Sequence, residues 1–365
     1  MSKKPLFVLL YGGRSSEHEI SCRSAAYVVK HLDREKWDLA LIGIDRDGRF
    51  VPQDSVSLRN KPPESLPIQS GGAGPRELAA LEALDPRRGF RPDQSIVVFP
   101  IVHGTGGEDG ALQGLLDLCG LPYIGADLTA SAVCMDKVLT KRLVAEAGVP
   151  VVPYIFMRGA EWRRAKESYL EAIYAKIDAE FLFVKPTSLG SSVGVSRVDC
   201  RDDLSASIDK ALVYDHAVMV EQGIKAREIE FAVMGGYSPE MSPPGEPVST
   251  GKFYSYDAKY RDKATPVADK PARLSEDELR LGKEIAFKAY QALGLYGMAR
   301  VDLFLTHEGE YFLNEVNTIP GFTEISQFPL MWQAAGLIPE AILDRLAELA
   351  IARFEVHRTI KRAHS

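Results

Sequence analysis

The first third of the chain contains three long runs of apolar residues, at residues 6–11, 39–44 and 96–102. Apolar runs without alternation are typical of parallel strands that are buried on both faces of a sheet. Two glycines, Gly12 and Gly13, follow the first run, and a helical pattern then extends from about residue 19 to residue 32. This order of strand, turn and helix predicts a doubly wound α/β layer, which we expect to end near Gly125.

The remainder of the chain predicts shorter elements. We expect strands at residues 181–185, 195–198, 217–222 and 227–234, and helices at residues 136–147, at residues 276–293 and near the C-terminus. Asp136 is a suitable N-cap for the first of these helices, and Gly148 with Pro150 ends it. Residues 54–92, rich in Pro, Gly and Ser, predict a surface insertion with one short helix at residues 76–84. Residues 250–272 lack periodicity and predict a functional lid.

Residues 300–317 alternate between apolar and polar on either side of Glu308-Gly309, a pattern that predicts a β-hairpin. A two- or four-residue turn at that point sets Asp302 opposite Glu315 and Arg300 opposite Asn317. Residues paired in this way share one face of the ribbon, with Cβ atoms ~5 Å apart.

Two carboxylates that face each other repel and destabilise a sheet, unless a hard divalent cation lies between them. Asn317 adds a third oxygen, and we expect Phe304 and Leu313 to continue the same face as a buried layer. The pattern therefore predicts a metal site formed by Asp302, Glu315 and Asn317. The alternative is a solvated hairpin end on which Arg300 neutralises one acid.

The loop that follows Lys185 has two glycines and three serines within eight positions, including Ser191 and Ser192. Such a composition lets backbone N–H groups approach an anion closely, as phosphate-binding loops require. Neither the G-x-x-x-x-G-K-[ST] nor the G-x-G-x-x-G pattern occurs here. The loop predicts either a phosphate site with Lys185 as its cation or a flexible hairpin tip.

Polar residues also follow other buried strands. Glu221 ends the strand at residues 217–222 and is suited either to a nucleoside or to a plain edge strand. Glu17 and His18 come at the first strand-to-helix turn, at the sheet edge where ligands of such folds bind. His103 follows the strand at residues 96–102 and is either a substrate contact, a general base or a structural histidine.

Composition narrows the class of protein. A charge of −6 over 365 residues argues against nucleic acid as the main partner. The cysteines lack C-x-x-C spacing and predict reduced core residues. No segment is long enough to span a membrane, and the N-terminus does not fit a signal peptide. These limits favour a cytoplasmic enzyme or binding protein.

Six motifs are distributed in order along nearly the whole chain. They begin at Gly12, His103, Met135, Lys185, Tyr256 and Asn314, and read GGxSxEHE, HGxxGEDG, MDK, KPxxxGSSVG, YDxKY and NExNTxPG. Together they resemble the D-alanine–D-alanine ligases of the ATP-grasp superfamily. The resemblance implies an N-terminal doubly wound parallel-sheet domain (residues 1–125), a small central α+β domain (126–220) and a C-terminal, mostly antiparallel domain (221–365).

The resemblance also implies how ATP is bound. Lys137 and Lys185 would contact its phosphates, Glu221 and Ile224 the adenine, and Glu228 the ribose.

Further contacts with ATP would come from Ser191 and Ser192 in the loop and from Lys259 on the lid. Asp302, Glu315 and Asn317 would hold two Mg²⁺ (or Mn²⁺) ions, on the face that the hairpin pattern indicates.

The same resemblance implies a site for two D-alanine molecules. Glu17 would bind the ammonium of the first, with His103 nearby. Arg300 and the Gly321 N–H would stabilise the oxyanion, and Ser326 would bind the carboxylate of the second D-alanine.

On the lid, Lys259 and Tyr260 would close over the site and join Glu17 and Ser191 in a hydrogen-bond network. Tyr260 favours an amine as the nucleophile, and therefore a dipeptide product. The expected activity is ATP-dependent formation of D-alanyl-D-alanine for peptidoglycan precursors, by a homodimer in the cytoplasm. The alternatives are a ligase with D-serine or D-lactate as its second substrate and a nucleotide-binding protein without catalysis.

Overall fold

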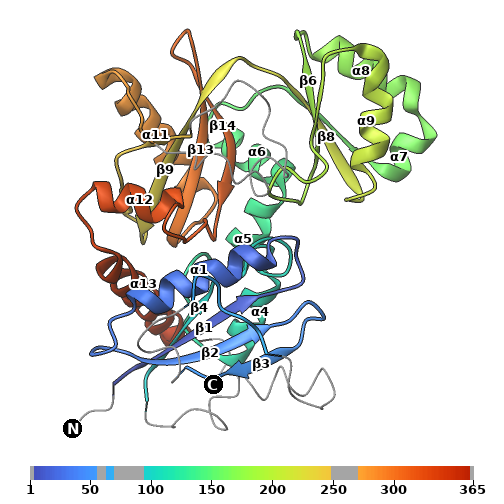
Figure 1. The fold of residues 1–365 in the computed structure, drawn as a ribbon. Coiled ribbons are helices and arrows are strands. Elements are labelled where there is room, and N and C mark those ends of the chain that lie inside the picture. The colour runs from blue at the N-terminus through green and yellow to red at the C-terminus, as the bar shows by residue number, and fades with distance from the viewer. Residues whose placement is uncertain (1–3, 56–62, 70–93, 248–269, 362–365) are drawn as a thin grey trace.

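The computed structural model describes residues 4–55, 63–69, 94–247 and 270–361. The predicted helix at residues 76–84 and most of the predicted lid at residues 250–272 lie outside these ranges. Three sheets organise the described residues (Figure 1).

The N-terminal sheet has the strand order β3-β2-β1-β4. Its strands are β1 (Leu6–Gly12), β2 (Asp38–Ile44), β3 (Phe50–Gln53) and β4 (Ile96–Pro100). β2, β1 and β4 are parallel, and β3 adds an antiparallel edge. The three apolar runs of the sequence are therefore the three parallel strands, as predicted.

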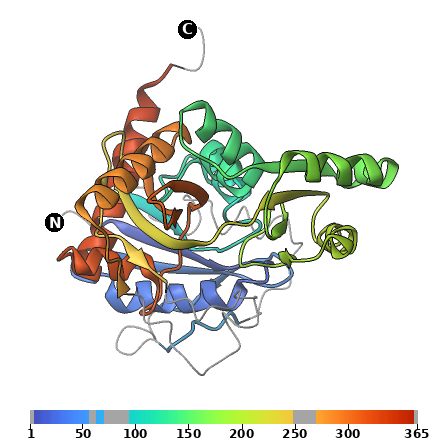
Figure 2. The same ribbon diagram turned by 90° about the horizontal axis from the view of Figure 1, so that it is seen from above.

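Helices cover both faces of this sheet, because β1 is apolar on both sides. Phe7 and Leu9 face the helices α1 (His18–His31) and α13 (Pro339–Thr359), whereas Val8 and Leu10 face α4 (Ala111–Cys119). Figure 2 shows α1, in blue, along one face of the sheet. Because α13 lies at the far end of the chain, residues 339–359 complete the core of the N-terminal sheet.

The central sheet is antiparallel, in the order β5-β8-β6-β7. Its strands are β5 (Tyr154–Arg158), β6 (Leu182–Pro186), β7 (Ser196–Val198) and β8 (Ala217–Gln222). Its helices are α7 (Gly159–Arg164), α8 (Lys166–Lys176) and α9 (Leu204–Ala211), with the short turn η1 (Arg201–Asp203) before α9. This unit has its own core around Trp162, Ile173, Val184 and Ile208.

The C-terminal sheet has the order β12-β11-β9-β13-β14, and β10 also pairs with β9. Its strands are β9 (Ala226–Gly235), β10 (Glu240–Met241), β11 (Gly245–Glu246), β12 (Lys270–Pro271), β13 (Gly297–Thr306) and β14 (Tyr311–Asn317). Helix α11 (Glu276–Ala292) packs on this sheet, and α12 (Gln327–Ala334) lies between it and α13.

Two helices connect the N-terminal layer to the other two sheets. They are α5 (Leu128–Met135) and α6 (Lys137–Glu146). Asp136 caps α6 by accepting from the N–H groups of Val138 and Leu139, and Gly148 (φ +76°) follows its end, as the sequence predicts. Among the described helices, none is long and apolar enough to cross a membrane.

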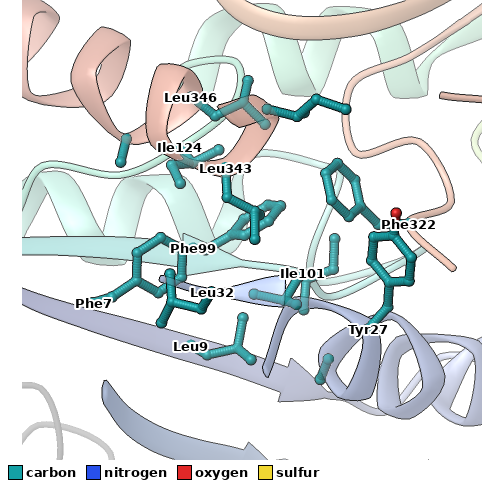
Figure 3. Close-up of a cluster of buried hydrophobic side chains, with 14 of the residues drawn as sticks. Phe7, Leu9, Tyr27, Leu32, Phe99, Ile101, Ile124, Phe322, Leu343 and Leu346 are labelled. Atoms are coloured by element: carbon teal, nitrogen blue, oxygen red, sulfur yellow. The ribbon is translucent and has the colours of Figure 1, made fainter. Parts of the chain in front are cut away.

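The turn after β14 reaches the N-terminal layer through an aromatic contact. Phe322 is fully buried between Tyr27 of α1 and Phe99 of β4, with ring centroids 5.9 and 5.6 Å away (Figure 3). Edge-to-face packing of this kind adds about 0.5–1.5 kcal/mol to the burial of the rings. Residues of the C-terminal turn are therefore fixed by the N-terminal sheet.

Candidate active site

The β13–β14 hairpin has the register that the sequence predicts at its far end. Asp302 pairs with Glu315, and Arg300 pairs with Asn317. The turn itself differs from the prediction, because it contains three residues, 307–309, instead of two or four. A hydrogen bond from the Thr306 N–H to the Glu310 carbonyl closes it.

A β-bulge restores the predicted register beyond residue 303 of the hairpin, on the side away from the turn. The register shifts between Asp302 and Leu303, so that Leu303 pairs with Leu313 and Asn314 is the extra residue. Phe304 consequently faces Phe312, and the prediction that Phe304 and Leu313 form one layer is wrong. The turn has an odd number of residues, so the side chains of β14 between the turn and the bulge point to the opposite face from the predicted one. Beyond the bulge they return to the predicted face.

Three acids form a row across three strands. Glu230 of β9 pairs with Asp302 of β13, which pairs with Glu315 of β14. The Arg300 guanidinium donates to both oxygens of Asp302 at 2.8 and 2.7 Å, and its Nε lies 3.4 Å from Glu230 Oε2. Asn317 Nδ2 donates to Asp302 Oδ2 at 2.9 Å. Arg300 thus neutralises one acid, as the alternative interpretation required, yet three carboxylates share one guanidinium.

The pKa values in this row reflect burial and the neighbouring charges. Burial raises the pKa of Asp302 to about 6 even though Arg300 acts to lower it, and Glu315 adds to the rise. Burial opposes the charge on Arg300, but the Asp302 and Glu230 carboxylates raise its pKa well above the ordinary value. In the described residues no three Asp, Glu, His or Cys side chains are arranged as a complete metal site. Asp302 and Glu315 with the Asn317 amide still fit a hard cation that also takes oxygens from a ligand or water.

The loop after β6 has a backbone conformation that suits anion binding. Ser191 and Ser192 both have left-handed backbone angles (φ 53° and 57°), an uncommon state for residues with a side chain. Asp215 holds the start of the loop by accepting from the Thr187 hydroxyl and the Ser188 N–H, both at 2.8 Å.

Two lysines contact Glu221 beside this loop, and a third lies near them. Glu221 Oε1 lies 2.9 Å from Lys141 Nζ, and Glu221 Oε2 lies 2.8 Å from Lys185 Nζ. Lys137 Nζ donates to the Leu189 carbonyl of the loop at 2.5 Å. Burial opposes the charge on Glu221, but the two bonded lysines outweigh it and lower its pKa to about 2.

The charge of the lysine cluster favours an anionic ligand. Burial lowers the pKa of Lys137 and of Lys141. It also opposes the charge on Lys185, but Glu221 outweighs it and raises the pKa of this lysine. Three lysines around one carboxylate attract a polyphosphate.

The nucleoside residues implied by the resemblance lie next to this cluster. Ile224 is half-buried in the connection from β8 to β9, and Glu228 is exposed near the start of β9. The Glu221 oxygens contact Lys141 and Lys185, and the expected contact of Glu221 with adenine stays a prediction.

The other end of the site centres on Glu17, the residue before α1. The Ser191 hydroxyl donates to Glu17 Oε1, so the loop of the central sheet meets the N-terminal layer at this carboxylate. Gly104 approaches closely, and a Cβ at that position would lie 2.5 Å from Glu17 Oε2. The structure therefore brings together the Glu17–Ser191 pair that the resemblance implied.

His103 lies in the site but is not open to a ligand. Its Nδ1 donates to the Ile319 carbonyl at 3.0 Å, and its Nε2 lies 2.9 Å from Ser24 Oγ. It is 3% exposed, and burial lowers its pKa, which favours the neutral ring. Nδ1 holds the turn at Ile319 and Nε2 contacts Ser24 of α1, and the expected contact of His103 with substrate stays a prediction.

Glu108 holds the same turn from the other side. Its Oε2 accepts from the Gly104 N–H at 2.7 Å and its Oε1 from the Ile319 N–H at 3.2 Å. Burial, with the nearby Glu17 carboxylate, raises its pKa to about 8. Glu108 was part of a motif but had no predicted role. Its position directly after two glycines was the available signal.

Gly321 and Ser326 lie together after β14, and their expected roles in the site stay predictions. A Cβ on Gly321 would lie 2.9 Å from Ser326 Oγ. Ser326 accepts from the Thr323 N–H at 2.9 Å and contacts the Thr323 hydroxyl at 2.7 Å. Lys259 and Tyr260, the two remaining predicted residues, lie outside the described ranges.

Comparison with known proteins gives the family. Residues 7–126 match the family model described as the D-ala D-ala ligase N-terminus, and residues 143–348 match the D-ala D-ala ligase C-terminus. D-alanine–D-alanine ligase A of Escherichia coli (strain K12) is 42% identical over 358 residues, which is 97% of each chain.

Solved structures agree with this result. The D-alanine–D-alanine ligase of Coxiella burnetii superposes with a TM-score of 0.80 at 36% identity, covering 97% of both chains. The VanG D-Ala:D-Ser ligase of Enterococcus faecalis gives 0.76 at 31% identity, covering 95% of this chain and 100% of that one. The predicted ATP-grasp fold class is confirmed, and the chain belongs to the D-alanine–D-alanine ligase family of ATP-dependent ligases.

Proposed function

We propose that this protein joins two D-alanine molecules to D-alanyl-D-alanine at the expense of ATP, through an acyl phosphate, for peptidoglycan precursors. The observation that carries the proposal is the convergence of three groups on one site. These are the lysine cluster around Glu221, the Arg300–Asp302–Glu315–Asn317 face, and the carboxylate of Glu17. The reaction needs cations near the phosphates, acids that hold the metal ions, and a carboxylate that binds the substrate ammonium, and each group supplies one of these.

Lys137 and Lys185 would serve the first step, in which a carboxylate anion approaches a triphosphate. We place the nucleotide between the predicted domains 126–220 and 221–365, against the Ser191–Ser192 backbone and the lysine cluster. Two Mg²⁺ (or Mn²⁺) ions held by Asp302, Glu315 and Asn317 would supply further neutralisation of the phosphates. Because the protein forms no covalent bond here, its contribution is positioning and electrostatics.

Glu221 and Ile224 would contact the adenine, and Glu228 the ribose, as the resemblance implies. The Glu221 carboxylate also fixes Lys185 by the ion pair at 2.8 Å.

Arg300 and the Gly321 N–H would serve the second step, in which the amine of the second D-alanine attacks the acyl carbon. The bidentate contact with Asp302 fixes the Arg300 guanidinium before substrate binds. A fixed donor needs no reorganisation when negative charge develops on the oxygen, and removal of one such donor typically reduces kcat by ~10²–10³.

The substrate ends would be held by charges of opposite sign or by hydroxyl groups. Glu17 would bind the ammonium of the first D-alanine, and Ser191 orients that carboxylate by its hydrogen bond. Ser326 would bind the carboxylate of the second D-alanine. His103 would lie near the first D-alanine, and it also holds the Ile319 turn.

Closure of the lid would exclude water, which otherwise hydrolyses the acyl phosphate. Lys259 and Tyr260 are the lid residues we propose to reach Glu17 and Ser191. We also propose that the protein acts as a homodimer in the cytoplasm.

A second candidate is ligation of D-alanine to D-serine. It is favoured by the likeness to the VanG D-Ala:D-Ser ligase at 31% identity over 95% of this chain.

One competition experiment tests both functions. Purified protein is given ATP and Mg²⁺ with D-alanine alone or with equal D-serine or D-lactate, while ADP and products are followed together. We expect one dipeptide per ADP, with D-alanyl-D-alanine in excess. Predominant D-Ala-D-Ser would favour the second candidate, and ATP turnover independent of D-alanine would refute both.

A further inference from the structure

Lys141 is a buried lysine that no sequence motif includes and to which the proposed mechanism gives no individual role. It lies on α6 one helical turn after Lys137, so the two ammonium groups leave the same side of the helix. Its side chain is 1% exposed. Two like charges at this spacing destabilise a helix unless carboxylates or other acceptors lie against them.

The contacts of Lys141 form a closed ring. Its Nζ donates to Glu221 Oε1 at 2.9 Å and to the Leu313 carbonyl at 3.3 Å. The other Glu221 oxygen lies 2.8 Å from Lys185 Nζ, which also reaches Asn314 Oδ1 at 3.5 Å. The peptide bond between Leu313 and Asn314 closes the ring, which joins α6, β8, β6 and β14.

The ring closes on the β-bulge of the hairpin. Leu313 is the last residue in the register set by the turn, and Asn314 is the extra residue. Without the bulge, Asp302 would face Asn314, and Glu315 would point to the opposite face of the sheet, since a shift of one residue reverses every later side chain. The bulge therefore determines that Glu315 stands beside Asp302.

We infer that Lys141 is a positioning residue for the nucleotide and metal sites: it holds Lys185 through Glu221, and it holds the bulge that aims Glu315 through the Leu313 carbonyl. The identity of the ligands, a nucleotide and a metal ion, rests on the proposed function. The positions of Lys185 and Glu315 rest only on the contacts of the ring.

Stability by itself does not account for a lysine at this place. A buried ion pair recovers its desolvation cost only in good geometry, and an apolar residue of similar volume is often as stable. Methionine would fill the same volume without a charge to bury. Methionine cannot donate to Glu221 or to Leu313, so Lys141→Met separates the role of the contacts from the role of the volume.

The test compares Lys141→Met with Arg142→Met. Arg142 is the next residue of α6 and is exposed, so the control makes the same chemical change outside the ring. In ligand-free protein, hydrogen exchange is measured over the strand Tyr311–Asn317. Affinity for ADP with Mg²⁺ is measured by calorimetry, and KM values for ATP and D-alanine by steady-state kinetics.

We expect Lys141→Met to exchange faster than wild type around Leu313 and Asn314 and to bind Mg²⁺-ADP ~10-fold or more weakly. A tenfold loss corresponds to about 1.4 kcal/mol, at the low end for a hydrogen bond to a charged group. The KM for ATP should rise in proportion while that for D-alanine stays within about twofold. Arg142→Met should match wild type in all three measurements.

Two results would overturn the inference. In the first, Lys141→Met matches Arg142→Met in both exchange and Mg²⁺-ADP affinity. In the second, it loses thermal stability while affinity and the KM for ATP stay unchanged, which is a structural role only. If Lys141→Met does not fold, Lys141→Gln keeps an amide donor and should give a smaller loss of the same kind. A wild-type protein that makes no dipeptide refutes the proposed function, whereas exchange and ADP affinity still decide the role of Lys141.

Discussion

Replacement of Glu108 by Gln should change how the stability of this protein depends on pH. Glu108 joins the loop after β4 to the turn after β14, through the N–H groups of Gly104 and Ile319. Gln keeps the shape of the side chain and one acceptor oxygen, but it cannot titrate. The substitution therefore removes one protonation equilibrium and about one hydrogen bond.

The magnitude follows from the pKa of Glu108, which is raised from 4.5 to about 8. A raised pKa means that the folded protein holds the proton more tightly than the unfolded chain. Stability from this group is fully present below pH ~4.5 and is lost as the pH rises through about 8. The full difference corresponds to roughly 4–5 kcal/mol. Because Glu108 is half-buried, water screens part of this electrostatic free energy. We therefore expect the stability to fall by about half of the full difference.

The assay is urea unfolding and thermal melting of ligand-free protein between pH 5 and pH 9. Wild type should lose stability across this range, and Glu108→Gln should lose less. The variant should be weaker at pH 5, by the lost acceptor, and should approach or exceed wild type at pH 9. Asp109→Asn makes the same change in charge one residue away and should retain the wild-type slope. Parallel pH profiles of wild type and Glu108→Gln would refute the reasoning.

Three further substitutions test the proposed chemistry. Glu315→Gln should weaken binding of Mg²⁺-ADP by at least ~10-fold and nearly abolish turnover, because an amide cannot neutralise the cation; an unchanged Mg²⁺ requirement in calorimetry would count against this metal site. Gly321→Ala places a Cβ 2.9 Å from Ser326 Oγ, so we expect kcat to fall by ~10²–10³ with little change in melting temperature. Alanine retains the N–H, so a normal kcat would count against a closely packed oxyanion site at this position. Tyr260→Phe should release more ADP per dipeptide, and a ratio that stays at one would argue against its role in the lid.

The parts of the fold that follow from local patterns could be predicted from the sequence. Residues 217–222 are the bounds of β8, and the cap and end of α6 lie where Asp136 and Gly148 indicate. These elements are specified by apolar runs, capping side chains and glycine, all of which act over a few residues. The predicted domain limits at residues 125 and 220 stay a prediction. Each sheet falls within one predicted segment, apart from the last two residues of β8.

Contacts between segments distant in sequence could not be predicted in the same way. The role of Lys141 depends on Glu221, 80 residues later, and on Leu313, 172 residues later. His103 has both ring nitrogens engaged because the Ile319 turn lies beside Nδ1 and Ser24 of α1 lies beside Nε2. The signal that was present for Lys141, its spacing of four from Lys137, is too common on solvated helices to indicate a site.

The hairpin register is a case in which two deviations compensate. The three-residue turn places Leu303 opposite Leu313, one position away from the symmetrical register that the sequence pattern suggests. The bulge at Asn314 then restores the pairing of Asp302 with Glu315. The pair of Asp302 with Glu315 was predicted from a symmetrical turn, and it is correct because the three-residue turn and the bulge offset each other. The bulge does leave a sign in the sequence, because two polar residues separate the buried side chains of Leu313 and Val316. The prediction did not use this break in the alternation.

The same turn after β14 explains why residues of the N-terminal layer should affect chemistry without touching substrate. Glu108 binds the N–H of Ile319 and His103 binds its carbonyl, two residues before Gly321. Ser24 of α1 contacts His103 and also accepts from the Phe322 N–H at 3.4 Å. Gly321 thus lies between two peptide groups that the N-terminal layer fixes. Any movement of that layer against the C-terminal sheet must displace the Gly321 N–H, so the packing between the two sheets and the proposed oxyanion site cannot change independently.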